Sequence, residues 1–150
     1  MELVVKINRI GKTISERHAH RYYDEVGLGI DFTARDVQAE LKEKGHPWER
    51  AKAFDGSAVV GAFVSLEELG KPVDDLAFTL HNHDQLVQSG NSSDMLFSVD
   101  RLIAEVSTFM TLKMGDLIFT GTPAGVAAVQ PGDRLSGQLE GRELFAVNVK

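Results

Sequence analysis

The sequence lacks several features that mark particular classes of protein. It contains no cysteine, which excludes disulfide bonds, thiolate metal sites and cysteine nucleophiles. No apolar run approaches the roughly 18 residues of a membrane-spanning helix. The first residues, Met-Glu-Leu-Val-Val-Lys-Ile, do not form the basic and apolar regions of a signal peptide. We therefore expect a cytoplasmic protein.

Basic residues are too few for a surface that binds polyanions. The chain has 16 Lys and Arg residues against 22 Asp and Glu residues, and its formal net charge is −6. Nucleic acids and anionic membranes are bound through basic surfaces. We therefore expect no nucleic-acid partner and no membrane partner.

The common catalytic motifs are missing as well. The sequence has no phosphate-binding loop, no dinucleotide fingerprint and no Gly-x-Ser-x-Gly turn. Among the five histidines, His46 precedes Glu49 by three residues, a spacing that a helix would align. Pro47 lies between them and disfavours such a helix, so we interpret this spacing as chance.

What the sequence does contain is a series of short apolar segments suited to one domain. Its 150 residues, 43% of them hydrophobic and 25% charged, are enough to bury a core. Strands are predicted over Glu2–Ile7, Val26–Ile30, Ser57–Val64, Leu76–Leu80, Gln85–Gln88, Leu117–Phe119, Arg134–Leu139 and Leu144–Lys150. Helices are predicted from Thr13 to Tyr23 or Asp24, from Thr33 to Lys44 and from Ser98 to Met110, with Thr13, Thr33 and Ser98 as caps. Many strands with three short helices are typical of an α+β, β-dominated fold.

The segment Asp116–Gly125 joins an apolar strand to a loop rich in small and hydroxyl residues. Leu117–Phe119 has the length and composition of a buried strand. The following Thr-Gly-Thr-Pro-Ala-Gly contains glycines, which let a ligand approach the backbone, and a proline, which stiffens the turn. The loop is interpreted either as a ligand-binding loop on a rigid strand or as a turn made of common turn residues.

Four charged residues lie in positions that charged residues seldom favour. Glu2 opens a predicted strand and Asp31 ends another; either they bind a cation such as Mg²⁺ or they are solvated or capping. Lys52 lies in an apolar run, where it either extends into solvent or is held near an anion. Arg35 lies in the first turn of a predicted helix, where the dipole disfavours a cation. It is therefore either placed for a partner or an ordinary surface residue.

Four segments, in order along the chain, resemble motifs of the fumarylacetoacetate hydrolase family. They are Gly29–Gln38 (Gly-Ile-Asp-Phe-Thr-Ala-Arg-Asp-Val-Gln), Trp48–Phe54, Gly90–Ser98 (Gly-Asn-Ser-Ser-Asp-Met-Leu-Phe-Ser), and Asp116–Gly125 with the turn Gln130–Asp133. Together they span nearly the whole chain, and an ordered set is more specific than any single motif. Gly45-His-Pro-Trp48 followed by Ala51-Lys-Ala-Phe54 resembles most the acylpyruvate hydrolase and oxaloacetate decarboxylase branch.

The resemblance implies a mixed β-roll of the family's C-terminal domain type, a homodimer, and a divalent cation held by three carboxylates. The cation would be Mg²⁺, or alternatively Mn²⁺ or Ca²⁺. Asp31 matches one ligand, and Glu2 matches the second glutamate of a Glu-x-Glu pair. The first glutamate would lie two residues before Glu2, at a position outside this chain. Residues 1–150 are therefore expected to be a single, N-terminally truncated catalytic domain of this family.

The resemblance also implies roles for polar residues near that cation. Lys52 and Gln38 are expected to be catalytic. Lys52 would add positive charge where an oxyanion develops, and Gln38 would orient water or substrate. Arg35, Gly121 and Thr122 are expected to bind the substrate, with Thr122 at its carboxylate end.

The family's chemistry implies a metal-dependent hydrolase or decarboxylase that cleaves C–C bonds in acylpyruvate-type acids, either 1,3-diketo or β-keto acids, through a metal-stabilised enolate. The substrate would be a small dicarboxylic or keto acid. The alternatives are a 2-hydroxyhepta-2,4-diene-1,7-dioate isomerase or decarboxylase of aromatic catabolism, and an inactive or structural fragment. Hydrolysis in the family also uses a His–Glu pair on an N-terminal lid, which has no match here. We therefore expect any residual activity to be decarboxylation.

Overall fold

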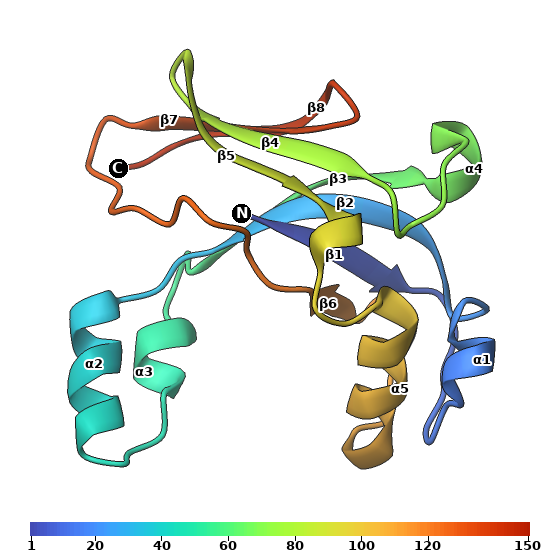
Figure 1. Ribbon diagram of the computed structural model, residues 1–150. Helices are drawn as coiled ribbons and strands as arrows, with labels where there is room; N and C mark the ends of the chain where they lie inside the picture. Colours follow the sequence, from blue (N-terminus) through green and yellow to red (C-terminus); the bar gives the residue numbers. More distant parts are fainter.

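Two four-stranded antiparallel sheets make up most of the computed structural model, which describes residues 1–150 (Figure 1). The first sheet has the strand order β3-β2-β1-β6, and the second has the order β5-β4-β7-β8. The first contains β1 (Glu2–Ile7), β2 (Tyr23–Asp31), β3 (Ala58–Ser65) and β6 (Leu117–Phe119). The second contains β4 (Ala77–Asn82), β5 (Gln85–Asn91), β7 (Arg134–Leu139) and β8 (Arg142–Asn148). The predicted α+β, β-dominated fold is confirmed.

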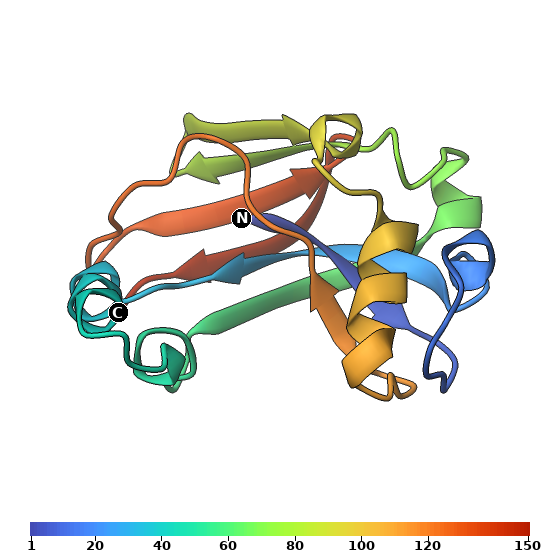
Figure 2. The same ribbon diagram turned by 60° about the horizontal axis from the view of Figure 1, so that its bottom comes forward.

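The helices lie at the two ends of the sheets. They are α1 (Glu16–Ala19), α2 (Arg35–Glu43), α3 (Glu49–Lys52), α4 (Leu66–Leu69) and α5 (Val99–Phe109), with a 3₁₀ turn at Ser92–Asp94. Figures 1 and 2 place α2 and α3 side by side at one end of the molecule, and α1, α4 and α5 at the other. No helix is both long and apolar enough to cross a membrane.

The hydrophobic core is built from alternating residues of the strands and one face of α5. On β1 the buried residues Leu3, Val5 and Ile7 belong to this core, as expected for side chains two apart on one face of a strand. On α5, Val99 and Ile103 are buried, one turn apart on the same helical face. Burying each such side chain contributes about 1.5–3 kcal/mol, so these contacts hold β1 and α5 in the core.

The predicted helix caps gave mixed results. Ser98 caps α5, because its hydroxyl accepts a hydrogen bond from Arg101 N. Thr13 is not a cap: it has a positive φ of 54°, and α1 begins only at Glu16. The reason is tertiary, because Thr13 N donates to the backbone oxygen of Ser107 on α5. The following helix is also shorter than predicted, and residues from Tyr23 onward belong to β2.

Two further predictions were wrong in detail. Thr33 does not cap α2, whose N-cap position is Ala34 and carries no side-chain hydrogen bond. Instead, the Thr33 hydroxyl contacts Lys52. The strand Leu117–Phe119 is not buried, because β6 lies at the edge of the first sheet and pairs only with β1. An edge strand of three residues is covered on fewer sides than a central one.

Candidate functional site

The register of β1 and β2 brings the two acids singled out in the sequence to one face of the first sheet. Glu2 on β1 lies opposite Gly29 on β2. Asp31 lies two residues further along β2, so its side chain points to the same face as the side chain of Glu2. Glu2 is buried, with 7% of its surface exposed, whereas the Asp31 side chain is 33% exposed. One end of this sheet face therefore carries two carboxylates.

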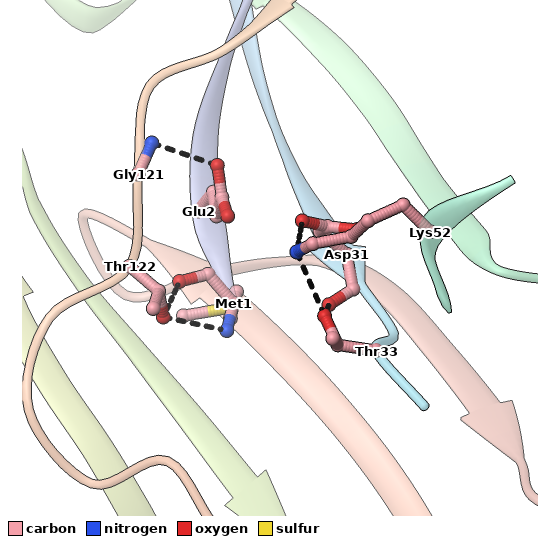
Figure 3. Close-up of polar contacts among 7 residues, drawn as sticks. All are labelled: Met1, Glu2, Asp31, Thr33, Lys52, Gly121 and Thr122. Carbon is pink, nitrogen blue, oxygen red and sulfur yellow. Dashed lines mark hydrogen bonds and ion pairs between the residues drawn. The ribbon is translucent and has the colours of Figure 1, made fainter. Parts of the chain in front are cut away.

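The loop after β6 fixes the carboxylate of Glu2. The backbone N–H of Gly121 donates to Glu2 Oε2 at 2.7 Å, and Figure 3 shows this bond beside the start of β1. The loop itself is tied to β1 through Thr120, whose hydroxyl and backbone N–H donate to the backbone oxygen of Leu3 at 2.9 and 3.2 Å. Hydrogen bonds to a carboxylate are stronger than neutral ones. The second oxygen, Glu2 Oε1, makes no hydrogen bond within the protein.

Lys52 reaches the other carboxylate from the short helix α3. Its Nζ lies 2.5 Å from Asp31 Oδ2 and donates to Thr33 Oγ1 at 2.8 Å. Of the two interpretations of this lysine, the structure shows the one in which an anion holds the ammonium. Figure 3 shows Asp31, Thr33 and Lys52 grouped on one side of β1, with Gly121 and Thr122 on the other. Asp31 Oδ1 makes no hydrogen bond within the protein.

Thr122 is hydrogen-bonded to Met1, which directly precedes β1, and to Gln88 on β5. Its hydroxyl donates to the backbone oxygen of Met1 at 2.8 Å. The same oxygen lies 3.1 Å from the side-chain nitrogen of Gln88 and 3.2 Å from the N-terminal ammonium of Met1, both of which are donors. The backbone N–H of Thr122 makes no hydrogen bond within the protein. The Thr122 hydroxyl is therefore already used in a hydrogen bond to Met1, whereas the Thr122 backbone N–H remains free to bind a ligand.

Arg35 and Gln38 lie on α2, three residues apart and therefore on one side of that helix. Arg35 is exposed and Gln38 is partly buried. Neither side chain makes a hydrogen bond or an ion pair within the protein. The structure therefore leaves both polar groups available, without placing either against Asp31 or Lys52.

The two carboxylates suit a hard divalent cation. No group of three or more His, Cys, Asp and Glu side chains is arranged to hold a metal; the carboxylates brought to this sheet face are the two of Glu2 and Asp31. Mg²⁺ is commonly held by one or two carboxylates, with water and substrate oxygens completing its shell. Glu2 and Asp31 each retain one oxygen without a protein partner, which fits this mode of binding. In the observed register the position opposite Asp31 lies directly before Met1, where the family resemblance places a further glutamate.

Two surface hollows adjoin this site, and the sequence motifs line them. One hollow, of about 460 Å³, lies along His46–Glu49, Lys52 and Ala53. The other, of about 530 Å³, lies between the loop Thr120–Ala124 and the segment Ser89–Asn91 with Asp94–Phe97. The motifs Gly90–Ser98 and Asp116–Gly125 thus border the second hollow. The motifs Gly29–Gln38 and Trp48–Phe54 are joined by the contact between Asp31 and Lys52. Both volumes are in the range of small-molecule sites.

Three polar residues of the site were missed in the sequence: Thr33, Gln88 and Thr120. Thr33 was assigned to a helix cap. Thr120 lies inside the motif Asp116–Gly125, and Gln88 lies two residues before the motif Gly90–Ser98; that position was the only signal available. Their roles depend on contacts with β1 across 117 and 87 residues of chain, respectively. Composition and periodicity carry no information on such distant pairs.

Comparison with known proteins gives consistent matches along the chain. Residues 1–147 match the family model described as fumarylacetoacetate hydrolase, C-terminal. The chain is 37% identical over 144 residues to an oxaloacetate tautomerase of Escherichia coli, covering 96% of this chain and 66% of that protein. It is 43% identical over 141 residues to a mitochondrial oxaloacetate tautomerase of Rattus norvegicus, covering 94% of this chain and 63% of that protein. The chain thus spans slightly less than two thirds of either relative.

Solved structures match the fold equally well. A fumarylpyruvate hydrolase from Pseudomonas aeruginosa, in complex with Mn²⁺ and pyruvate, superposes with a TM-score of 0.90 at 36% identity, covering 98% of this chain and 63% of that one. A 2-hydroxyhepta-2,4-diene-1,7-dioate isomerase from Mycobacterium marinum superposes with a TM-score of 0.84 at 33% identity, covering 95% of this chain and 54% of that one.

Proposed function

This chain belongs to the fumarylacetoacetate hydrolase family, and from that premise we propose that residues 1–150 form one catalytic domain of a divalent-metal-dependent enzyme acting on small keto acids. The proposed substrates are acylpyruvate-type acids, either 1,3-diketo or β-keto acids. Oxaloacetate and fumarylpyruvate are the examples that the relatives' names provide. The observation that carries the proposal is the contact of Lys52 with Asp31 on the sheet face that also bears Glu2.

Glu2 and Asp31 are the proposed ligands of the cation. Each offers an oxygen that no protein group occupies, and Gly121 N–H fixes the orientation of the Glu2 carboxylate. We propose Mg²⁺ as the ion, with Mn²⁺ or Ca²⁺ as substitutes; the Mn²⁺ complex of the Pseudomonas aeruginosa relative supports a divalent ion. When bound, the ion would supply Lewis-acid polarisation of a keto oxygen.

Lys52 is proposed to stabilise the charge that develops during the reaction. In decarboxylation of a β-keto acid the bond to the leaving carboxylate breaks, CO₂ departs, and the electron pair moves onto the keto oxygen. In keto–enol tautomerisation a carbon-bound proton passes to water, the pair of the broken C–H bond forms a C=C bond, and the pair of the C=O π bond moves onto the same oxygen, which takes a proton from water. Lys52 Nζ, already aimed at an anion, would donate a hydrogen bond to that oxygen. One such preorganised donor is worth about 10²–10³-fold in rate.

The remaining polar groups are proposed to orient the substrate. Arg35 would pair with a substrate carboxylate, and Gln38 would orient water or substrate. Gly121 and Thr122 would hold the substrate's carboxylate end. Thr122 can do so with its available backbone N–H, or with its hydroxyl if that group turns away from the backbone oxygen of Met1.

Two other functions remain candidates, and each has a supporting observation. Hydrolysis of a 1,3-diketo acid is supported by the similarity to a fumarylpyruvate hydrolase. Isomerisation or decarboxylation of 2-hydroxyhepta-2,4-diene-1,7-dioate is supported by the similarity to such an isomerase. Apart from these two functions, an inactive or structural role is the remaining alternative, and only an assay separates it from the others.

A substrate panel tests the proposed function. The purified chain is assayed with oxaloacetate, acetylpyruvate and 2-hydroxyhepta-2,4-diene-1,7-dioate, in Mg²⁺, in Mn²⁺ and in EDTA. We expect metal-dependent turnover, fastest for tautomerisation or decarboxylation of oxaloacetate. Turnover of the dienoate alone would select the isomerase. No turnover of any compound, together with no metal binding, would select the inactive or structural role.

We also propose that the protein forms a homodimer and that it is located in the cytoplasm. Large apolar side chains at the end of α5 and around the Gly11–Leu112 bridge are exposed, namely Ile10, Phe109, Met110 and Met114. Such a cluster supports contact with another protein surface. Light scattering after size exclusion would give twice the 16.4 kDa chain mass, and Met114→Glu would shift the protein toward the monomer.

A further inference from the structure

Gln88 is a buried polar residue whose whole side-chain amide is engaged. It lies on β5 and is 5% exposed. Its Oε1 accepts from the N-terminal ammonium of Met1 at 2.6 Å. Its Nε2 lies 3.1, 3.3 and 3.4 Å from Thr122 Oγ1, Pro123 O and Ala124 O, respectively. A buried amide that lost these partners would be left desolvated and unpaired, which is costly.

These contacts close a ring of hydrogen bonds between three separate segments. The Met1 nitrogen donates to Gln88, Gln88 donates to Thr122, and Thr122 donates back to the Met1 oxygen. The ring fixes which way the amide faces. A reversed amide would set its nitrogen against the Met1 nitrogen, and its oxygen against three oxygen atoms. Only one orientation of Gln88 therefore satisfies all of its neighbours.

The ring lies directly beside the proposed metal ligand. Met1 and Thr122, its two other members, are the chain neighbours of Glu2 and Gly121, which are joined by the 2.7 Å bond from Gly121 N to Glu2 Oε2. Figure 3 shows the Met1–Thr122 contacts next to this bond. The distance between the loop and the start of β1 is thus set by Gln88 on one side and by the Glu2–Gly121 bond on the other.

We propose that Gln88 is a positioning residue for the metal site. It holds the Gly121 N–H against Glu2 Oε2, so that Glu2 Oε1 faces the site. This inference rests on the proposed function only in reading Glu2 as a cation ligand. The Gln88 ring and its effect on the Gly121 bond stand without a metal. Groups that orient metal ligands from behind typically contribute 10–100-fold to metal affinity.

Gln88→Glu and Gln88→Met test the proposal, because both keep the length of the side chain. The carboxylate cannot donate to Thr122 or to the two loop carbonyls, and methionine makes none of the bonds. Ser92→Ala is the matched control: Ser92 is also 5% exposed and accepts one buried bond, from Leu76 N at 2.8 Å, but it has no contact with the ring. Thr122→Val opens the ring from the loop side and serves if neither Gln88 variant folds.

Two measurements on the full chain decide the outcome. Amide hydrogen exchange without metal should be at least about tenfold faster at Gly121 in the Gln88 and Thr122 variants, and unchanged there in Ser92→Ala. Mn²⁺ affinity, followed by the electron paramagnetic resonance of the free ion, should fall about 10–100-fold in the Gln88 variants and stay unchanged in Ser92→Ala. Unchanged Gly121 exchange would overturn the proposal. Faster Gly121 exchange with unchanged Mn²⁺ affinity would reduce Gln88 to a structural residue. If the unmodified chain binds no Mn²⁺, the proposed function fails, and the exchange result alone still decides whether Gln88 positions Glu2.

Discussion

Replacing Lys52 with methionine should leave the fold nearly unchanged, raise the affinity for a divalent cation and lower the reaction rate. The substitution keeps most of the side-chain length and removes the ammonium. It deletes the 2.5 Å contact with Asp31 Oδ2 and the 2.8 Å bond to Thr33 Oγ1. Three quantities should then respond separately: the free energy of unfolding, the affinity for a divalent cation, and the reaction rate.

The effect on stability should be small, because water reaches both partners. The side chains of Lys52 and Asp31 are 36% and 33% exposed, and exposed ion pairs contribute about 0.2–1 kcal/mol. In a domain of this size about 1 kcal/mol corresponds to about 2–4 °C in melting temperature. We therefore expect the metal-free variant to melt no more than about 4 °C below the parent protein.

The effect on metal affinity should have the opposite sign. Lys52 competes for Asp31 and repels a cation bound there. Even in the aqueous limit, like unit charges about 4 Å apart repel by about 1 kcal/mol, which corresponds to roughly fivefold in affinity. Lys52→Met should therefore bind Mn²⁺ at least about fivefold more tightly. It should also lose about 10²–10³-fold in kcat, because a donor to the oxyanion is gone.

Lys6→Met is the matched control for this experiment. Lys6 Nζ lies 2.6 Å from Glu25 Oε2, and their side chains are 40% and 37% exposed, so a pair of similar geometry is lost away from the site. The assay combines thermal unfolding without metal, Mn²⁺ titration by calorimetry, and kcat with oxaloacetate. Weaker Mn²⁺ binding by Lys52→Met, or a loss of kcat no larger than that of Lys6→Met, would refute the reasoning.

Two other substitutions test the packing of β2. Gly29→Ala would place a Cβ 2.7 Å from Val59 O, a backbone atom that cannot move aside, so we expect a loss of about 1–3 kcal/mol in urea unfolding. An unchanged midpoint would contradict this packing. Tyr23 donates to Asp100 Oδ1 at 2.9 Å, and burial, reinforced by Asp100, raises the pKa of Tyr23. Because the folded state holds this proton more tightly, its contribution is complete below about pH 10 and is lost as the pH rises. The unfolding free energy of Tyr23→Phe should therefore fall less steeply above pH 10 than that of the parent protein. The same dependence on pH in both proteins would contradict this role of Tyr23.

The sheet strands and their turns were accessible from the sequence because their signals are local. The short apolar segment Glu2–Ile7 predicted β1 with its observed bounds. The hairpin predicted around Glu140–Arg142 was also recovered, with a turn of two residues, Glu140 and Gly141, before β8 begins at Arg142. Both turn residues have the positive φ, 50° and 78°, that a tight hairpin turn demands. Each of these features depends on residues within a few positions of one another.

The missed features depend on partners far along the chain. Thr33 has the side chain of a helix cap, yet its hydroxyl is used by Lys52, which lies 19 residues away. Gln88 looks like an ordinary strand residue until the start of β1 and the loop at Thr122 close around it. The pairing of Glu2 with the face of Asp31 likewise depends on strand register, which is set by the whole sheet. The residue types of the site could be read from the motifs, whereas their contacts could not.

The most direct test of the central claim is the rise in melting temperature on adding a divalent cation. A cation present at about 100 times its Kd adds about 2.7 kcal/mol, or roughly 5–10 °C for a domain of this size. We predict this rise with Mg²⁺ or Mn²⁺ in the parent chain. The control variant Asp24→Asn should show the same rise, because it removes an exposed acid of β2, the strand that carries Asp31. We predict no rise in Asp31→Ala and none in Glu2→Gln. No rise in the parent chain at millimolar ion, or an equal rise in the Asp31 variant, would contradict a metal site built on Glu2 and Asp31.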